Sequence, residues 1–281
     1  MIIKDITELI GNTPLLEIDS SIHKIKNLTI YAKLELFNPF GSLKDRVGWG
    51  MIKDNLEEIK KNNKVVIESS SGNTSKALSL LCSKEGIPFR NYTNRIKEQN
   101  VREILQLLNC EIIEFPGVLE CRPSNPNDRN DPKFIAMELE ETQRDKFFYT
   151  KQYQNEKNPN SHKIMGKEIS NDLEKVDYFF SFLGTGGSSR GVGEILKTEK
   201  NTSLIGVVSE EDEYIPGGRS LNEMWETGFF DRSFYDSIQP CTISDAIEGM
   251  LTLQRECGLL IGPTGGATYQ SLINFFKSKT L

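Results

Sequence analysis

The feature of this 281-residue chain that most restricts its fold is an alternation of short apolar runs with longer periodic segments. Runs such as 64–68 (KVVIE) and 177–183 (DYFFSFL) have strand length and are rich in β-branched or aromatic residues. The segments between them carry apolar residues at helical spacing. This alternation is typical of parallel sheets whose strands are connected by helices. We therefore predict an α/β protein.

The expected elements can be placed by residue range. Strands are expected at 28–36, 64–68, 88–93, 111–115, 147–150, 177–183 and 203–208. Helical segments are expected near 44–60, 73–85, 96–109, 133–145, 162–173, 189–199 and 243–257, with a last helix after the Gly-rich turn 262–267. The stretch 116–132 is rich in Pro, Asn and Asp and predicts a long surface loop, either a lid or an excursion without a role.

Composition excludes several classes of function. The net charge of −6 gives no support to nucleic-acid binding. No apolar run has the length of a membrane span, and the first residues lack the layout of a signal peptide, so we expect a cytoplasmic protein without a membrane partner. The five cysteines form no C-x-x-C pair and are expected to be free thiols. With only His23 and His162 present, no metal site is expected.

A lysine in the stretch NPFGSLKDRVGW (38–49) stands where the helix dipole disfavours a cation. Ser42 and Asp45 have the S-x-x-D spacing that caps a helix, which puts Lys44 in the first turn, at the positive end of the dipole. A solvated surface lysine is the ordinary interpretation of one such residue. A lysine shielded from water and close to positive potential has a lowered pKa and can act as a Schiff-base nucleophile and then as a base.

Two loops that follow expected strands are suited to anions. In ESSSGNTSKAL (68–78) a run of hydroxyls, a glycine and an amide precedes a helix near Asn73, which suits a small carboxylate; simple capping by Ser71 or Asn73 is the alternative. In GTGGSSRGVG (184–193) the glycines can form a nest of backbone N–H groups for one phosphate. The alternative is a turn that only lets helix and sheet pack closely.

The second loop matches neither common nucleotide motif. No G-K-[ST] follows, so it is not a Walker loop, and the third glycine of G-x-G-x-x-G falls on Ser189. A third loop, GPTGGA (262–267), offers Thr264 as a donor to a neutral ring nitrogen, although a tight turn alone would explain it. A reactive lysine, a carboxylate loop and a monophosphate cup together indicate pyridoxal 5′-phosphate.

Six blocks in order carry a resemblance to a known family: IGNTPLL (10–16), KLELFNPFGSLKDR (33–46), ESSSGNTSKAL (68–78), QYQNEKNPNSH (152–162), GTGGSSRGVG (184–193) and GLLIGPTGGA (258–267). The chain resembles the cysteine synthase (O-acetylserine sulfhydrylase) and cystathionine β-synthase group of fold-type II pyridoxal-phosphate enzymes. The resemblance implies a two-lobed, three-layer fold like that of the tryptophan synthase β chain. It implies a smaller mobile lobe at 35–147 and a larger lobe from 1–34 and 148–281, with a C-terminus shorter than is usual in the family.

The resemblance also implies roles for individual residues. Lys44 would be the catalytic residue and form the Schiff base with the cofactor, and Asn73 would hydrogen-bond the cofactor's phenolic oxygen. The phosphate would be held by Gly184, Thr185, Gly186, Gly187 and Ser188, and Thr264 would face the pyridine nitrogen. The substrate carboxylate would be bound by Ser70, Ser71, Gly72, Asn73 and Thr74 with help from Gln152.

The implied reaction is β-replacement on an O-activated L-serine, O-acetylserine or O-phosphoserine, through an α-aminoacrylate. Sulfide is the simplest nucleophile and gives L-cysteine, with an amine or another thiol as alternatives. A non-catalytic paralogue that binds a partner or metabolite is a further alternative, and a homodimer is implied by the family. Arg219, in IPGGRSLNEMWETGFFD (215–231), could pair with a leaving phosphate or make a surface ion pair.

Overall fold

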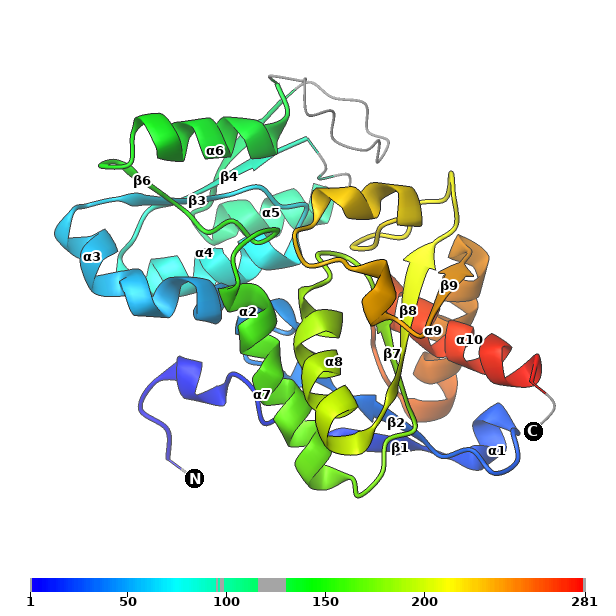
Figure 1. The fold of residues 1–281 in the computed structure, drawn as a ribbon. Helices are drawn as coiled ribbons and strands as arrows, with labels where there is room; N and C mark the ends of the chain where they lie inside the picture. The colour runs from blue at the N-terminus through cyan, green and yellow to red at the C-terminus, as the bar shows by residue number, and fades with distance from the viewer. Residues whose placement is uncertain (1, 95, 97–98, 116–129, 280–281) are drawn as a thin grey trace. The chain divides into compact units, whose positions relative to one another are not determined.

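The computed structural model describes residues 2–94, 96, 99–115 and 130–279 (Figure 1). The chain divides into two compact units. The first contains Met1–Ile10 and Asn38–Ser161, and the second contains Gly11–Phe37 and His162–Leu281. The expected lobe boundaries differ from this division, because 1–10 and 148–161 fall in the first unit and 35–37 fall in the second. Both units are α/β, which confirms the predicted fold class.

The first unit is built on a parallel sheet of four strands in the order β5-β4-β3-β6. Its strands are β3 (Val65–Glu68), β4 (Phe89–Thr93), β5 (Glu111–Glu114) and β6 (Phe147–Tyr149). Its helices are α2 (Lys44–Ile52), α3 (Leu56–Lys61), α4 (Asn73–Glu85), α5 (Gln99–Leu107) and α6 (Pro132–Thr142).

Helices cover both faces of this sheet because successive strand residues point to opposite sides. Val66 packs into a core cluster shared with α2 and α4, whereas the next residue, Ile67, packs with Tyr149 and Ala136 of α6. Figure 1 shows α6 on one side of β3 and β4 and α2 with α4 on the other. Strands buried on both faces explain the nearly continuous apolar runs in the sequence.

The strand order of the first unit reverses next to β3. The chain runs outward through β4 and β5 and then returns to place β6 on the other side of β3. Ligands of open α/β sheets bind outside the carboxyl ends of the strands at such a reversal. The residues that follow β3 and β6 are therefore candidates for a binding site.

The second unit holds two smaller sheets. Strands β1 (Leu15–Ile18) and β2 (Ile30–Lys33) pair antiparallel, and the parallel strands β7 (Tyr178–Phe182), β8 (Ser203–Ser209) and β9 (Ser237–Cys241) lie in the order β7-β8-β9. Its helices are α1 (Ser20–His23), α8 (Gly187–Lys200), α9 (Ile243–Cys257) and α10 (Pro263–Lys277). The division between the units falls within α7 (Lys157–Asp172).

Most predicted elements are present, with a few differences. Strands β1 and β9 were not predicted; β9 contains Pro240, which is tolerated because β9 is an edge strand. The expected helix at 44–60 is divided by a 3₁₀ turn at Lys53–Asn55, where Asp54 and Asn55 favour turn conformations. Residues 116–129 of the predicted surface loop, with Cys121, lie outside the described residues.

The cysteines that the structure describes form no disulfide, as predicted. Cys82, Cys110, Cys241 and Cys257 are free thiols. No helix among the described residues is both long enough and apolar enough to cross a membrane.

Candidate active site

Lys44 is the first residue of α2, which confirms its predicted place in the first turn. The capping differs from the expected pattern, because the N-cap position is Leu43 and no side chain caps the helix there. The Ser42 hydroxyl instead accepts a hydrogen bond from the Lys44 backbone N–H at 3.2 Å. The Asp45 carboxylate accepts one from the Phe40 N–H at 2.6 Å, which ties the preceding turn to the helix.

The side chain of Lys44 is partly buried and makes no ion pair or hydrogen bond within the described residues. Burial lowers the pKa of its ammonium from 10.5 to about 8, because the charged form loses its solvation by water. No neighbouring cation is needed to explain the shift, contrary to the sequence-based expectation. At pH 7 about one Lys44 amine in ten is therefore neutral and nucleophilic.

Helix α2 packs against α4. A Cβ added at Gly48 would lie 3.2 Å from Leu81 and 3.3 Å from Ala77, and one added at Gly41 would lie 3.6 Å from the Lys76 ammonium. These contacts place the middle of α2 and the turn before it against α4.

No side chain of the polar loop after β3 caps the helix that follows it. Helix α4 begins at Asn73, as predicted, and its N-cap is Gly72, without a side-chain cap. The alternative in which Ser71 or Asn73 caps the helix is therefore wrong. The first-turn amides are left for another acceptor, which is the arrangement that binds anions.

The predicted carboxylate residues come together at the carboxyl ends of β3 and β6. The Thr74 hydroxyl donates to the Gln152 side-chain oxygen at 2.8 Å, across 78 residues of sequence. The Gln152 side-chain nitrogen donates to the Ser69 carbonyl at 2.8 Å. The Ser70 hydroxyl accepts from the Gly72 N–H at 3.2 Å. Ser70, Thr74 and Gln152 are buried, whereas Ser71 and Asn73 are exposed.

Two buried side chains that the sequence reasoning missed hold this loop in place. Asn91, in the middle of β4, accepts from the Ser70 N–H and donates to the Ser70 carbonyl, both at 3.0 Å. Glu68, the last residue of β3, accepts from the Ser69 N–H at 2.7 Å. Glu68 gave a signal, a carboxylate at the end of the apolar strand VVIE, since buried polar groups need specific partners. Asn91 gave none, because its strand FRNYT also contains Arg90 and Thr93.

The glycine-rich loop after β7 opens α8, which begins at Gly187 rather than at 189 as expected. Gly186 is the N-cap with φ of +79°, a conformation that favours glycine, and no side chain caps the helix. The Gly187 N–H donates to the Thr185 hydroxyl at 3.3 Å. The alternative role of these glycines, to allow close packing, applies to Gly184. A side chain at this position would place its Cβ only 2.8 Å from the Gly217 carbonyl oxygen. The loop therefore combines close packing with an uncapped helix start.

Thr264 belongs to the same unit and lies near this loop. It is the second residue of α10, is partly buried, and its hydroxyl has no partner within the described ranges. Its methyl group would lie 3.6 Å from a Cβ at Gly217, and Gly217 in turn adjoins Gly184. The second unit thus places a free hydroxyl close to the glycine loop.

Arg219 is neither exposed nor a surface ion pair. It is 5% exposed, and its guanidinium donates to the carboxylate of Glu226, itself 4% exposed, at 2.6 Å. The sequence-based alternative of a surface ion pair is therefore wrong, because the ion pair that Arg219 makes is buried. A substrate phosphate would have to compete with Glu226 for this guanidinium.

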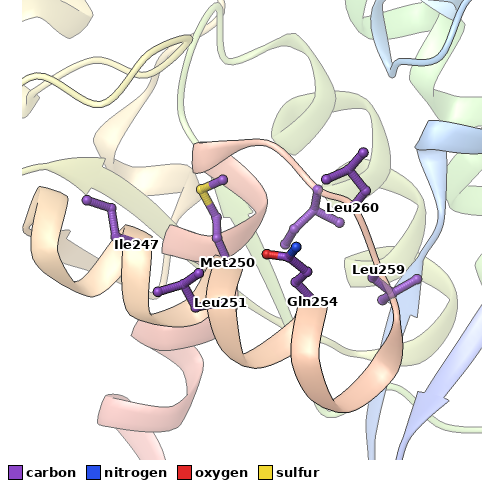
Figure 2. Close-up of a pocket in the computed structure, with 7 residues that line it drawn as sticks. Ile247, Met250, Leu251, Gln254, Leu259 and Leu260 are labelled. Atoms are coloured by element: carbon purple, nitrogen blue, oxygen red, sulfur yellow. The ribbon is translucent and has the colours of Figure 1, made fainter.

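A shallow groove of about 90 Å³ on the second unit has a different character. Figure 2 shows its lining, which comes from α9 and the segment after it: Ile247, Met250, Leu251, Gln254, Leu259, Leu260 and Ile261. It offers no cation or hydroxyl. It is too apolar to be the site of anion chemistry.

Comparison with known proteins points to one family. A family model described as "Pyridoxal-phosphate dependent enzyme" matches residues 6–281. The O-acetylserine dependent cystathionine beta-synthase of Bacillus subtilis is 31% identical over 287 residues, which cover 98% of this chain and 90% of the relative. A cysteine synthase of Staphylococcus aureus is 28% identical over 291 residues, which cover 99% of this chain and 90% of the relative.

A solved structure agrees with these sequence matches. The crystal structure of a hydrogen sulfide-producing enzyme from Fusobacterium nucleatum superposes with a TM-score of 0.84 at 29% identity. The match covers 98% of this chain and 93% of that one. The residues described above fit pyridoxal phosphate: an unpaired amine with lowered pKa, an uncapped glycine nest and a free hydroxyl.

Proposed function

Because this chain belongs to the pyridoxal-phosphate-dependent enzyme family, we propose that it replaces the β-substituent of an O-activated L-serine, with sulfide as nucleophile and L-cysteine as product. The relatives named cysteine synthase and O-acetylserine dependent cystathionine beta-synthase support this reaction class. The observation that carries the proposal is Lys44, a partly buried amine that no described carboxylate neutralises. A protein that only binds a metabolite would have no use for such an amine.

We propose the following roles for individual residues in binding the cofactor. Lys44 would bond to it covalently, and Asn73 would donate to its phenolic oxygen. The loop Gly184, Thr185, Gly186, Gly187 and Ser188 would hold its phosphate, and the Thr264 hydroxyl would donate to its ring nitrogen. Bound pyridoxal phosphate supplies an electrophilic carbon and a ring that delocalises an electron pair released at the substrate's Cα.

The chain's own residues would orient the substrate and move one proton. The backbone amides of 72–74, which no side chain caps, would bind the substrate carboxylate. Thr74 already donates its hydroxyl proton to Gln152, which leaves the second N–H of the Gln152 amide and the hydroxyls of Ser70 and Ser71 as side-chain donors for that carboxylate. Lys44 Nζ would accept the proton from Cα, and its pKa of about 8 lets it hold and return a proton near neutral pH.

The test is a spectrum of the purified protein. O-acetyl-L-serine should change the visible absorption of the bound cofactor, and sulfide should restore it while L-cysteine is formed. O-phospho-L-serine should be tried in parallel. If neither donor changes the spectrum of protein that carries the cofactor, the proposed function is wrong.

A thiol nucleophile is the second candidate, because one relative is named a cystathionine beta-synthase that depends on O-acetylserine. The same preparation can decide between them. Faster restoration of the spectrum by a thiol amino acid than by sulfide, with a thioether product, would favour the thiol. An amine product would point to the diaminopropionate alternative.

We propose O-acetyl-L-serine rather than O-phospho-L-serine as the donor. Arg219 remains the residue that could bind a leaving phosphate, but that role requires the phosphate to displace Glu226 from a buried ion pair. An acetyl ester needs no such exchange.

We also propose a homodimer formed through the groove of Figure 2. Ile247, Leu251 and Leu260 are 49%, 36% and 81% exposed there, which is unusual for a cluster of large apolar residues. Glu248 and Arg255 are exposed beside this stripe, seven residues apart, and neither has a partner in the described chain. In a two-fold pairing of α9 with its copy, Glu248 of one chain would meet Arg255 of the other.

A cytoplasmic location remains part of this proposal. It is supported by the free thiols of the described cysteines, since disulfides are rare in a reducing compartment. Fractionation of cells with detection of the protein in the soluble cytoplasmic fraction would test it.

A further inference from the structure

A buried carboxylate of the first unit has no charged partner. Glu68 ends β3 beside the reversal of strand order and is 0% exposed. Within the described chain no lysine or arginine pairs with it. Buried carboxylates are costly unless paired or fully hydrogen-bonded, so an unpaired one in the interior calls for a function.

The carboxylate of Glu68 accepts hydrogen bonds from both sides of the reversal. One oxygen accepts from the Ser69 N–H at 2.7 Å. The other accepts from the Gln152 N–H at 3.1 Å and from the Thr150 hydroxyl. Glu68 therefore joins the loop that follows β3 to the segment that follows β6.

These bonds close a ring around Ser69. Glu68 binds the Ser69 N–H, and the Gln152 side chain binds the Ser69 carbonyl at 2.8 Å. Asn91 does the same for both backbone groups of Ser70. Two consecutive loop residues are thus held by side chains instead of by sheet or helix, which sets where the uncapped amides after them point.

We propose that Glu68 is a positioning residue for the substrate-carboxylate loop, because it fixes Gln152 and Ser69 in the arrangement that presents the amides of 72–74. Glu68 itself does not touch the substrate. The proposal rests on the proposed function for its consequence in catalysis, but its structural part does not. The geometry also explains why Thr74 and Gln152 meet although they are far apart in the sequence.

Glu68 can hold the loop by hydrogen bonds both as a carboxylate and as a neutral carboxylic acid. The Thr150 hydroxyl has a second acceptor, the Ile67 carbonyl at 3.4 Å. A neutral Glu68 can donate its proton to Thr150, which can then donate to Ile67, while both backbone N–H groups keep their acceptors. A glutamine cannot do this, because its NH₂ group must face either the Ser69 N–H or the Gln152 N–H.

Glu68→Gln is therefore the test, with Glu114→Gln as the matched control. Glu114 ends β5 of the same sheet, is exposed and pairs with Arg102. For Glu68→Gln we expect faster amide exchange of 69–74 and 150–154 in the holoenzyme without substrate. We expect KM for O-acetyl-L-serine to rise roughly tenfold, with kcat changed less than about threefold and cofactor content unchanged. The control should match the wild type.

Unchanged exchange and unchanged KM in a folded Glu68→Gln protein would overturn the inference, and so would a loss confined to kcat. If the wild type processes no donor, the proposed function fails, and the exchange data alone decide whether Glu68 holds the loop. If Glu68→Gln does not fold, Thr150→Val removes only the hydroxyl donor. It should raise KM roughly two- to fivefold and speed exchange in the same segments; wild-type values would overturn the inference.

Discussion

Lys44 stands at the positive end of the dipole of α2, and its burial lowers the pKa of its ammonium group. The helix dipole disfavours the charge, and partial burial removes solvating water. The usual remedy would be an adjacent carboxylate, and none is described for Lys44. The protein therefore keeps an amine that is partly neutral at physiological pH.

Replacement of this amine should abolish cofactor attachment. We expect Lys44→Ala to lose the visible absorption of the bound cofactor after dialysis, together with all turnover. Borohydride reduction of the wild type should label a peptide that contains Lys44, as peptide mass analysis can show. Lys53→Ala, an exposed lysine at the other end of α2, is the control and should keep both properties. A label on any other lysine would contradict the assignment.

The buried ion pair of Arg219 should contribute mainly to stability. Arg219→Ala removes the guanidinium that pairs with the buried Glu226 carboxylate, and breaking a buried ion pair typically costs about 3–5 kcal/mol in the free energy of unfolding. We expect any loss of kcat/KM to be similar for O-acetyl-L-serine and O-phospho-L-serine. Denaturant unfolding and kinetics with both donors provide the measurements.

A second variant separates stability from donor recognition. Adding Glu226→Gln to Arg219→Ala removes the buried charge that has lost Arg219 and should restore part of the stability. A selective loss of about 2 kcal/mol or more for the phosphate donor, persisting in the double variant, would show that Arg219 binds a leaving phosphate.

At the scale of elements, the start of α8 should act as an anion site. Gly186→Asp puts a carboxylate into an uncapped helix start that would receive a phosphate. We expect cofactor affinity to fall roughly tenfold or more, since a lost hydrogen bond to a charged group is worth about 1.5–3 kcal/mol. Equilibrium dialysis against pyridoxal phosphate measures it.

Gly258→Asp is the control for backbone strain at this position. Gly258 also has a positive φ, +67°, and an added Cβ would meet nothing within 4 Å. The control introduces the same charge and the same conformational strain away from α8, so it should leave cofactor affinity unchanged. Equal losses in both variants would mean that strain, and not the anion site, explains the effect.

At the scale of the whole molecule, the burial of Glu68 should appear in the pH dependence of stability. Its pKa is raised from 4.5 to about 7 because burial disfavours the carboxylate. Between these values the folded protein holds a proton that the unfolded chain releases, so the stability from neutral Glu68 is full below pH 4.5 and is lost as pH rises to 7. The shift corresponds to about 3 kcal/mol.

Urea unfolding of the wild type and Glu68→Gln across pH 4.5–7.5 isolates this contribution. The difference in the free energy of unfolding between the two proteins should fall by about 3 kcal/mol over that range. His23, whose pKa is lowered by burial, has the opposite effect on stability but is present in both proteins and cancels. A difference that does not vary with pH would contradict a raised pKa for Glu68.

The proposed dimer predicts a change in assembly. Leu251→Glu should convert a dimer to a monomer in sedimentation velocity, because it places a charge in the apolar stripe of α9. Leu107→Glu is the control, since Leu107 is 82% exposed on α5 outside that stripe. Reversing the charge at Glu248 alone (Glu248→Arg) or at Arg255 alone (Arg255→Glu) should weaken association. Reversing both charges in one protein should restore it. A wild-type monomer at high concentration would exclude this interface.

The local pattern of the sequence was sufficient for much of the fold. Helices α4 and α9 have the predicted bounds, because periodic apolar residues and the glycines at 86 and 258 mark them within short windows. Lys44 could be located from a helix signal and the dipole alone. Strand β9 could not, because its five residues include a proline that only an edge position permits.

The sequence by itself determined the candidate residues for the chemistry: a lysine at a helix start, hydroxyls before α4, glycines before α8 and Thr264. Those are local signals, set by backbone geometry within a few residues. Only the tertiary structure decided how such residues are held. The carboxylate of Glu68, the amide of Asn91 and the ion pair of Arg219 with Glu226 take their properties from burial and from partners far along the chain or brought beside them by packing. Desolvation depends on everything that surrounds a group, so no local pattern contains it.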